Sequence, residues 1–189
     1  MDIPAAPDYR LAFQLAPVGL ILSRERHIVD CNQRVCEMFG ATPEQLIGQR
    51  FRILYPSADE YERTGARIAP ILGRDGVYAD HRVMRRVGGA LASQTFWCHV
   101  TGRAIDRDAP HAAGIWTFED LSAQRPVTAA LTPREREVAA QLLQGLTAKE
   151  IGRALGLSHR TVEVHRARLM RKYQASTAAE LVQKLMGGL

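Results

Sequence analysis

The chain has 189 residues, of which 46% are apolar and 24% are charged. These values exclude a wholly disordered or collagen-like chain, and the length suffices for one large or two small domains. Three cysteines without a CxxC spacing argue against a disulfide framework or a zinc site and favour a reducing compartment, the cytoplasm. The longest apolar run, residues 17–22, is too short to cross a membrane, and no export signal is expected.

The net charge of +5 is concentrated in the last third of the chain. Residues 1–126 contain 15 Arg and 15 acidic residues, which balance, whereas residues 127–189 contain seven Arg and three Lys against five acidic residues. Such asymmetry favours a polyanionic partner for the basic segment, and nucleic acid is a commoner one than a membrane. The alternative is a basic face that is merely solvated.

The first 120 residues mix strand-like and helix-like patterns. Residues 18–23 and 27–31 are apolar runs separated by three charged residues, which predicts a hairpin. Capping boxes beginning at Thr42 and Ser57 predict helices, the second one extending to about residue 72. Strand-like runs follow at residues 76–86, 94–105 and 112–119. This order predicts an α+β domain with one antiparallel sheet.

A small, polar stretch at residues 121–130 predicts a linker, and the pattern beyond it is wholly helical. Capping residues at Thr132, Thr147, Ser158 and Thr177 predict four helices in about 60 residues, which is a compact bundle.

The second and third of these helices are joined by a short turn at residues 156–158. Gly152 lies four residues before Gly156, where a close helix crossing needs a small residue. Ile151 and Val162 are among the residues expected to bury the contact between the helices. This spacing is typical of a helix-turn-helix, and it predicts that the third helix reads DNA.

A helical projection gives the third helix two faces. Val162, Leu169 and Tyr173 point toward the core of the bundle. The opposite face is basic and contains two small apolar side chains; it consists of Arg160, Val164, Ala167, Arg168 and Arg171. Small apolar groups on a basic face suit a major groove, where they can approach thymine methyl groups. A solvated helix would have little reason to expose Val164.

Residues 131–138, 147–151 and 158–172 closely resemble the LuxR-type (GerE-type) DNA-binding domain, and residues 161–167 resemble its FixJ branch. The resemblance covers residues 130–189 without a gap. It implies an all-α four-helix domain that binds double-stranded DNA as a homodimer, with contacts between the final helices. In that helix, the apolar stripe is Ala178, Leu181, Val182 and Leu185. The stripe either packs on the domain's own core or forms a twofold contact.

The resemblance implies base-edge contacts by Glu163, Val164 and Ala167, to which the outer face adds Arg168. The phosphate contacts are expected at Lys149, Arg160, Thr161, His165, Arg171 and Lys172. Some family members have Lys where this chain has Glu163 and Ala167, so the operator sequence is not predicted. Glu163 either accepts a hydrogen bond from a cytosine amino group or pairs with a neighbouring arginine. His165 is either a DNA contact or a half-buried packing residue.

The first region resembles a PAS sensor domain over residues 9–122. The matching motifs are residues 13–20, 30–32, 38–40, 44–48, 96–100 and 117–122. The resemblance implies a five-stranded antiparallel sheet flanked by helices around a small cavity, used for sensing or dimerisation. The expected organisation is therefore a tail at 1–8, a sensor at 9–122, a linker at 123–130 and the DNA-binding domain at 131–189.

The cofactor is not assigned by the sequence. The candidate pocket residues are Trp97, Cys98, His99 and Trp116, all on expected strands. Heme would need an axial His, Cys or Met, and the helix expected at 57–72 has none. The remaining heme candidates, each more often a packing or surface residue, are His81, Met84, Cys98, His99 and His111. The cysteine-containing flavin motif of light sensors is missing. Cys31 and Cys36 fit buried packing, with thiol redox sensing as the alternative.

These patterns predict a one-component transcriptional regulator whose PAS-like domain senses a small molecule or cofactor state, or mediates dimerisation, and controls the helix-turn-helix dimer. The alternative is a phosphorylation- or partner-controlled regulator in which that domain is only a protein-interaction module. No catalytic constellation, metal-ligand spacing or membrane segment stands out, so an enzyme is not expected. The signal, and the choice between activation and repression, are left open.

Overall fold

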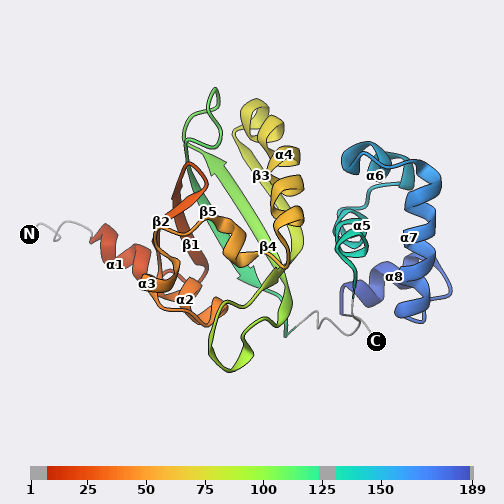
Figure 1. Ribbon diagram of the computed structural model, residues 1–189, viewed down its shortest axis with the longest axis horizontal. Coiled ribbons are helices and arrows are strands. Elements are labelled where there is room, and N and C mark those ends of the chain that lie inside the picture. Colours follow the sequence, from red (N-terminus) through yellow and green to blue (C-terminus); the bar gives the residue numbers. More distant parts are fainter. Residues whose placement is uncertain (1–7, 124–130, 188–189) are drawn as a thin grey trace, which may run out of the picture.

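The computed structural model describes residues 8–123 and 131–187, which form two parts packed against each other (Figure 1). Apart from Asp8 and Ala123, the expected tail and linker lie outside the described residues. The elements of the first part are α1 (Tyr9–Gln14), β1 (Gly19–Arg24), β2 (His27–Cys31), α2 (Gln33–Phe39), α3 (Pro43–Leu46), the 3₁₀ helix η1 (Phe51–Leu54), α4 (Ala58–Asp75), β3 (Val77–Arg85), the 3₁₀ helix η2 (Gly89–Leu91), β4 (Thr95–Ala104) and β5 (Ala113–Asp120).

The five strands form one antiparallel sheet in the order β2-β1-β5-β4-β3, which confirms the expected α+β fold. Successive residues of a strand point to opposite faces, so β4 serves two cores. Phe96, Cys98 and Val100 lie in the first part's own core, whereas Trp97 lies in the core shared with the second part. Gly102 is needed in β4 because a Cβ there would lie 2.3 Å from the Trp116 ring of β5.

The helix α4 covers the inner face of the sheet. The Ser57 hydroxyl caps it by accepting a hydrogen bond from the backbone N–H of Glu60, as the capping box predicted. The helix ends at Asp75, three residues beyond the expected end, and Gly76 caps it in the left-handed region (φ 75°).

The second part consists of α5 (Pro133–Leu143), α6 (Ala148–Leu155), α7 (His159–Lys172) and α8 (Ala178–Leu185). The four capping residues expected from the sequence all begin these helices. The bundle rests on the sheet through α5, which lies between β3 and the other three helices (Figure 1). Val83 and Trp97 of the sheet share a buried cluster with Val138 and Leu142 of α5.

Candidate DNA-reading surface and sensor cavity

The turn between α6 and α7 brings the two helices close together. A Cβ at position 152 would lie 2.8 Å from the carbonyl oxygen of Leu157, so the expected need for a small residue is a steric one. The Leu157 N–H donates to the Gly152 carbonyl over 2.8 Å, and Gly156 adopts a left-handed conformation (φ 64°). Ile151 and Val162 are fully buried at the crossing. These contacts fix the direction in which α7 leaves the bundle.

The helix α7 has the two faces that its sequence predicts. Val162, Leu169 and Tyr173 are buried in the bundle. The residues of the opposite face are all exposed; they are Arg160, Val164, Ala167, Arg168 and Arg171. With 44% of its surface exposed, Val164 is an apolar side chain on an otherwise basic surface. The surface therefore offers both cationic and methyl groups to a DNA groove.

Two expected DNA contacts already have partners within the bundle. Arg166 donates to the Glu163 carboxylate over 3.3 Å, so the arginine pairing expected as an alternative is present. The Lys172 ammonium lies 2.6 Å from the carboxylate of Glu135, which is buried near the start of α5. Burial raises the pKa of Glu135, but hydrogen bonds from Lys172 and Thr132 outweigh it and leave that pKa below its usual range. Lys172 therefore joins α7 to α5 in addition to any role on DNA.

The other expected phosphate contacts differ in exposure. Lys149 is exposed in the first turn of α6, and Thr161 hydrogen-bonds the capping Ser158 side chain over 2.8 Å. His165 is half-buried, and its Nδ1 is buried without a hydrogen-bond partner in the part of the chain that the structure describes. The half-buried position of His165 agrees with the packing role that the sequence left open. Its role in DNA binding is still a prediction.

The apolar stripe of α8 is divided between two environments. Leu181 and Leu185 are buried in the core of the bundle. Val182 is half-buried and Ala178 is exposed, so these two residues are available to a second copy of the chain. Dimerisation through this stripe would use its outer edge only.

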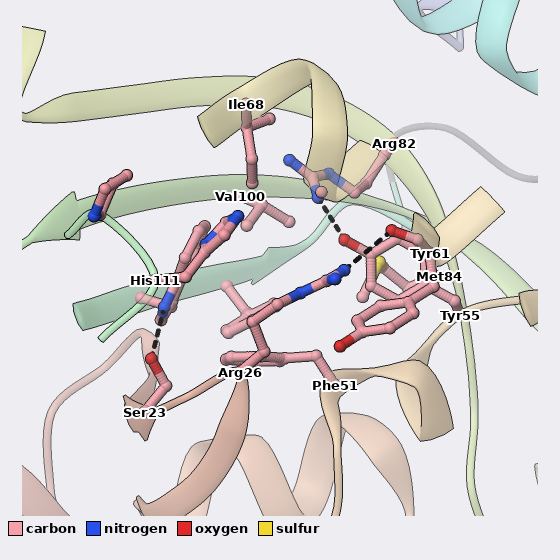
Figure 2. Close-up of a pocket in the computed structure, with 14 residues that line it drawn as sticks. Ser23, Arg26, Phe51, Tyr55, Tyr61, Ile68, Arg82, Met84, Val100 and His111 are labelled. Carbon is pink, nitrogen blue, oxygen red and sulfur yellow. Dashed lines mark hydrogen bonds between the residues drawn. The ribbon is translucent and has the colours of Figure 1, made fainter. Parts of the chain in front are cut away.

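The inner face of the sensor sheet encloses a small cavity of about 30 Å³ (Figure 2). Aromatic and aliphatic side chains form most of its wall, and Ser23, Arg26, Arg82 and His111 add polar groups. The apolar wall consists of Phe51, Tyr55, Tyr61, Ile68, Met84, Val100, Trp116 and Phe118.

Of the four candidate pocket residues, Trp116 lines the cavity, and its indole N–H donates to the Ser23 hydroxyl over 3.0 Å. Cys98 faces the same side of the sheet but is buried in the core behind the cavity wall. Trp97 and His99 project from the other face, because strand residues alternate between the two faces. There His99 pairs with His81 across the strands, the two ring nitrogens lying 3.2 Å apart.

Ser23, Arg26 and Arg82 were not expected from the sequence to lie in the cavity, whereas His111 was among the heme candidates. Arg26 follows Glu25 in a tight turn with positive φ and stacks on the Tyr61 ring, 3.8 Å from its centre. Gly65 makes room for it, since a Cβ there would lie 2.3 Å from the guanidinium. This glycine, in the interior of an expected helix, was the available signal. Burial lowers the pKa of His111, and Arg26 lowers it further, so its imidazole is neutral at pH 7.

The thiols of Cys31, which is buried, and Cys36, which is half-buried, are poor nucleophiles. The sulfur atoms of Cys31 and Cys36 lie 3.9 Å apart, and burial raises the pKa of Cys31 to about 12 and that of Cys36 in the same direction. Both thiols are therefore protonated at neutral pH. Within residues 8–123 and 131–187, no three potential metal-ligating side chains gather, and no helix has the length and apolarity of a membrane span.

Comparisons with known proteins match both parts of the chain. Residues 17–123 match the PAS domain family, and residues 129–185 match the bacterial regulatory proteins of the luxR family. UhpA, a transcriptional regulatory protein of Escherichia coli, is 52% identical over 58 residues, 31% of this chain and 30% of that protein. The chain spans about a fifth to two fifths of the length of the curated relatives it matches.

Two solved structures share the fold. The first is a PAS domain of a LuxR-family transcriptional regulator from Burkholderia thailandensis, in complex with ethanol; it is 57% identical, covers 61% of this chain and 99% of its own, and has a TM-score of 0.58. The second is the Vibrio cholerae VqmA dimer, which is 20% identical, covers 97% of this chain and 88% of its own, and has a TM-score of 0.55. The second likeness extends over both parts of the chain.

Proposed function

Because the chain belongs to the PAS domain family and carries a luxR-family DNA-binding domain, we propose that it is a one-component transcriptional regulator in which the state of the sensor cavity sets the arrangement of a DNA-bound homodimer. The observation that carries this proposal is that one helix, α4, contributes to both the cavity and the contact with α5.

The two faces of α4 have separate tasks. Tyr61, Gly65 and Ile68 recur at helical spacing and line the cavity. Glu60 and Arg63, on the adjacent face, bind residues of α5. A ligand that displaces the first set moves the second set with it, because both belong to one rigid helix. The sensor can therefore act on α5 without a signal passing through the linker.

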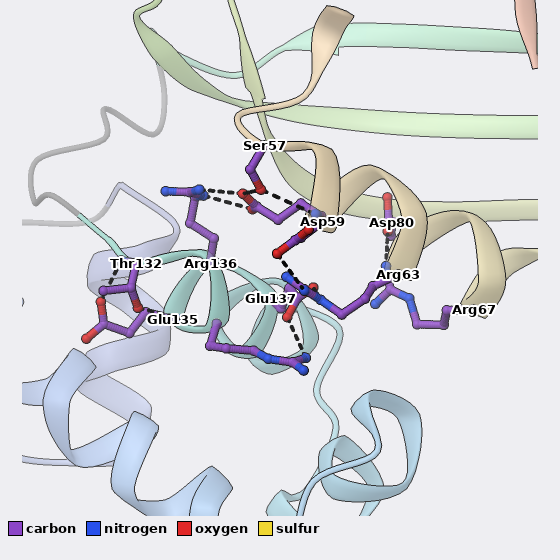
Figure 3. Close-up of polar contacts among 11 residues, drawn as sticks. Ser57, Asp59, Arg63, Arg67, Asp80, Thr132, Glu135, Arg136 and Glu137 are labelled. Atoms are coloured by element: carbon purple, nitrogen blue, oxygen red, sulfur yellow. Dashed lines mark hydrogen bonds and ion pairs between the residues drawn. The ribbon is translucent and has the colours of Figure 1, made fainter. Parts of the chain in front are cut away.

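The contact between α4 and α5 consists of two ion pairs (Figure 3). Arg136 binds both carboxylate oxygens of Glu60, with one Nε–Oε2 distance of 2.9 Å. Arg63 Nε lies 2.7 Å from the Glu137 carboxylate. Both carboxylates are buried, and removing one partner of a buried pair is strongly unfavourable. Together with the buried cluster of Val83, Trp97, Val138 and Leu142, these pairs therefore fix the position of the bundle on the sensor.

The position of the bundle leaves the outer face of α7 free, since the bundle contacts the sheet through α5 on its opposite side (Figure 1). This arrangement therefore does not support a mechanism in which the sensor blocks DNA binding by covering α7. We propose instead that the two reading helices of a dimer can take two relative positions, and that ligand binding favours one of them. This requires the ligand to bind the two dimer arrangements with different affinities. The VqmA structure is a dimer, and the Burkholderia thailandensis domain holds ethanol, which support a dimer and a small-molecule signal respectively.

The protein acts where its DNA lies, in the cytoplasm, and we assign it no catalytic step. The partner-controlled alternative has one observation in its favour. Three apolar side chains of α1 and its C-terminal capping residue are exposed: Tyr9, Leu11 and Leu15. They offer a contact surface on the sensor that the cavity does not explain.

The test replaces Glu60 by Gln in the full chain and measures affinity for DNA fragments selected by binding to the wild-type protein. Glu37→Gln is the matched control, because it removes an ion pair with Arg34 on a helix far from α5. We expect Glu60→Gln to change both DNA affinity and the domain arrangement seen by small-angle scattering, and Glu37→Gln to change neither. Equal DNA affinity and scattering for all three proteins would overturn the proposed coupling through α4.

A further inference from the structure

The polar groups of the cavity differ in whether their hydrogen bonds are already made. The Ser23 hydroxyl accepts from Trp116 and donates to the Gly114 carbonyl. Arg82 donates to Asp80 and to the Tyr55 hydroxyl, each over 2.6 Å, and its Nη2, which makes no hydrogen bond to the described residues, lies 2.6 Å from the Asp80 carboxylate. The Tyr61 hydroxyl is different: it is buried and has neither a hydrogen-bond partner nor a counter-charge among the described residues. Buried hydroxyl groups are normally satisfied, so this oxygen indicates the place where a ligand contributes the missing bond.

The Tyr61 hydroxyl is well placed to meet a ligand. Figure 2 shows it turned inward among the lining residues, beneath the Arg26 side chain. Arg26 is held above the ring by Glu62, 3.2 Å away, and by the backbone carbonyl of Tyr61. Since Glu62 is exposed, this guanidinium can swing outward and admit a molecule. Burial raises the pKa of Tyr61, so the hydroxyl keeps its proton and can donate it.

Each charged side chain of the cavity wall has an ion-pair partner. Arg82 lies 2.6 Å from Asp80, which also pairs with Arg67 behind the cavity wall, and Arg26 pairs with Glu62. His111 is neutral at pH 7 because burial lowers its pKa. A charged ligand would lose its hydration here without meeting an unpaired opposite charge among the described lining residues, which is unfavourable. The cavity therefore favours a neutral molecule.

The size of the cavity limits the ligand further. A volume of about 30 Å³ admits roughly two water-sized groups between aromatic rings. We infer that the cavity binds a neutral alcohol or carbonyl compound of about two to four non-hydrogen atoms, whose oxygen accepts a hydrogen bond from the Tyr61 hydroxyl. This inference rests on the proposed function for the idea that the sensor has a small-molecule signal, and adds the chemical class and the anchoring residue.

The experiment compares three probes of nearly equal size and different charge: 2-propanol, acetate and isopropylammonium. Each is titrated into the full chain without DNA, and methyl NMR signals of Ile68 and Val100, which line the cavity, are followed. We expect 2-propanol to shift these signals with a weak, roughly millimolar dissociation constant, as suits so small a ligand, and the two ions to leave them unchanged.

The anchoring role is tested with Tyr61→Phe, which keeps the ring and removes only the unpartnered oxygen. We expect 2-propanol affinity to fall between about twofold and tenfold, with no loss of thermal stability. Tyr9→Phe, at an exposed tyrosine of α1, is the matched control and should bind as the wild type does.

Three results would overturn the inference. They are a larger response to acetate or isopropylammonium than to 2-propanol, unchanged 2-propanol affinity in Tyr61→Phe, and no response to any probe. Because no DNA is present, these results are independent of the coupling through α4. A protein that binds 2-propanol but shows no change of DNA affinity would instead contradict the proposed function alone.

Discussion

The sensor and the DNA-binding bundle use arginine in opposite ways. In the sensor, Arg82 is buried and paired with Asp80, and Arg86 lies 2.8 Å from Asp120. On α7, Arg160, Arg168 and Arg171 are exposed and form no ion pair within the described part of the chain. The same residue type thus fixes the structure in one half and is exposed and unpaired in the other, where we expect it to contact phosphate. The net charge of each half does not show this difference, because the difference lies in whether each arginine has an acidic partner.

The largest effect is expected where the sensor's paired charges are broken. Asp80→Asn leaves Arg82 buried without its counter-charge and weakens the contact with Arg67, so we expect the free energy of unfolding to fall by about 3–5 kcal/mol. Chemical denaturation measures it. Asp75→Asn, which removes an exposed pair with Arg74, is the control and should be nearly neutral. A similar loss of unfolding free energy in both variants would mean that burial does not make the Asp80 pair more important for stability than the Asp75 pair.

The next test concerns the unpaired surface of α7. Val164→Glu places a carboxylate among the exposed arginines and toward DNA phosphates, so we expect specific DNA affinity to fall by about a hundredfold or more while the fold is kept. Fluorescence anisotropy measures the affinity, and circular dichroism checks the fold. Val77→Glu, at a comparably exposed valine on the sensor, is the matched control and should bind normally. Unchanged binding by Val164→Glu would show that another face of α7 meets the groove.

The smallest effect is expected from the loss of one cation on α7. It is tested by comparing Arg171, which forms no ion pair with the described residues, with Lys172, which pairs with Glu135. Arg171→Ala should weaken binding to all DNA sequences and reduce the slope of log affinity against log salt by about 0.9, as for one lost phosphate contact. Lys172→Ala should also lower stability, because it leaves the buried Glu135 without its ammonium partner. An unchanged slope for Lys172→Ala, with stability reduced, would assign Lys172 to the bundle rather than to DNA.

The features predicted well are those that one element determines by itself. The two faces of α7 follow from helical periodicity, and the start of each bundle helix from a single capping residue, such as Thr132 or Ser158. The cavity could not be predicted in this way. Trp97 and Trp116 lie on neighbouring strands, yet only the register that pairs Gly102 with Trp116 turns them to opposite faces. Arg26, Tyr61 and His111 come from three elements that only tertiary packing brings together.

The pairing of Arg136 with Glu60 has a consequence for how such regulators can be recombined. A bundle transplanted onto another sensor would carry Arg136 and Glu137 to a surface that lacks their partners, and the original sensor would keep a buried Glu60 with no cation beside it. The two parts are therefore not freely exchangeable modules. A working chimaera of this protein would have to take α4 and α5 from the same parent. Its junctions would therefore lie before α4 or after α5, and not between them.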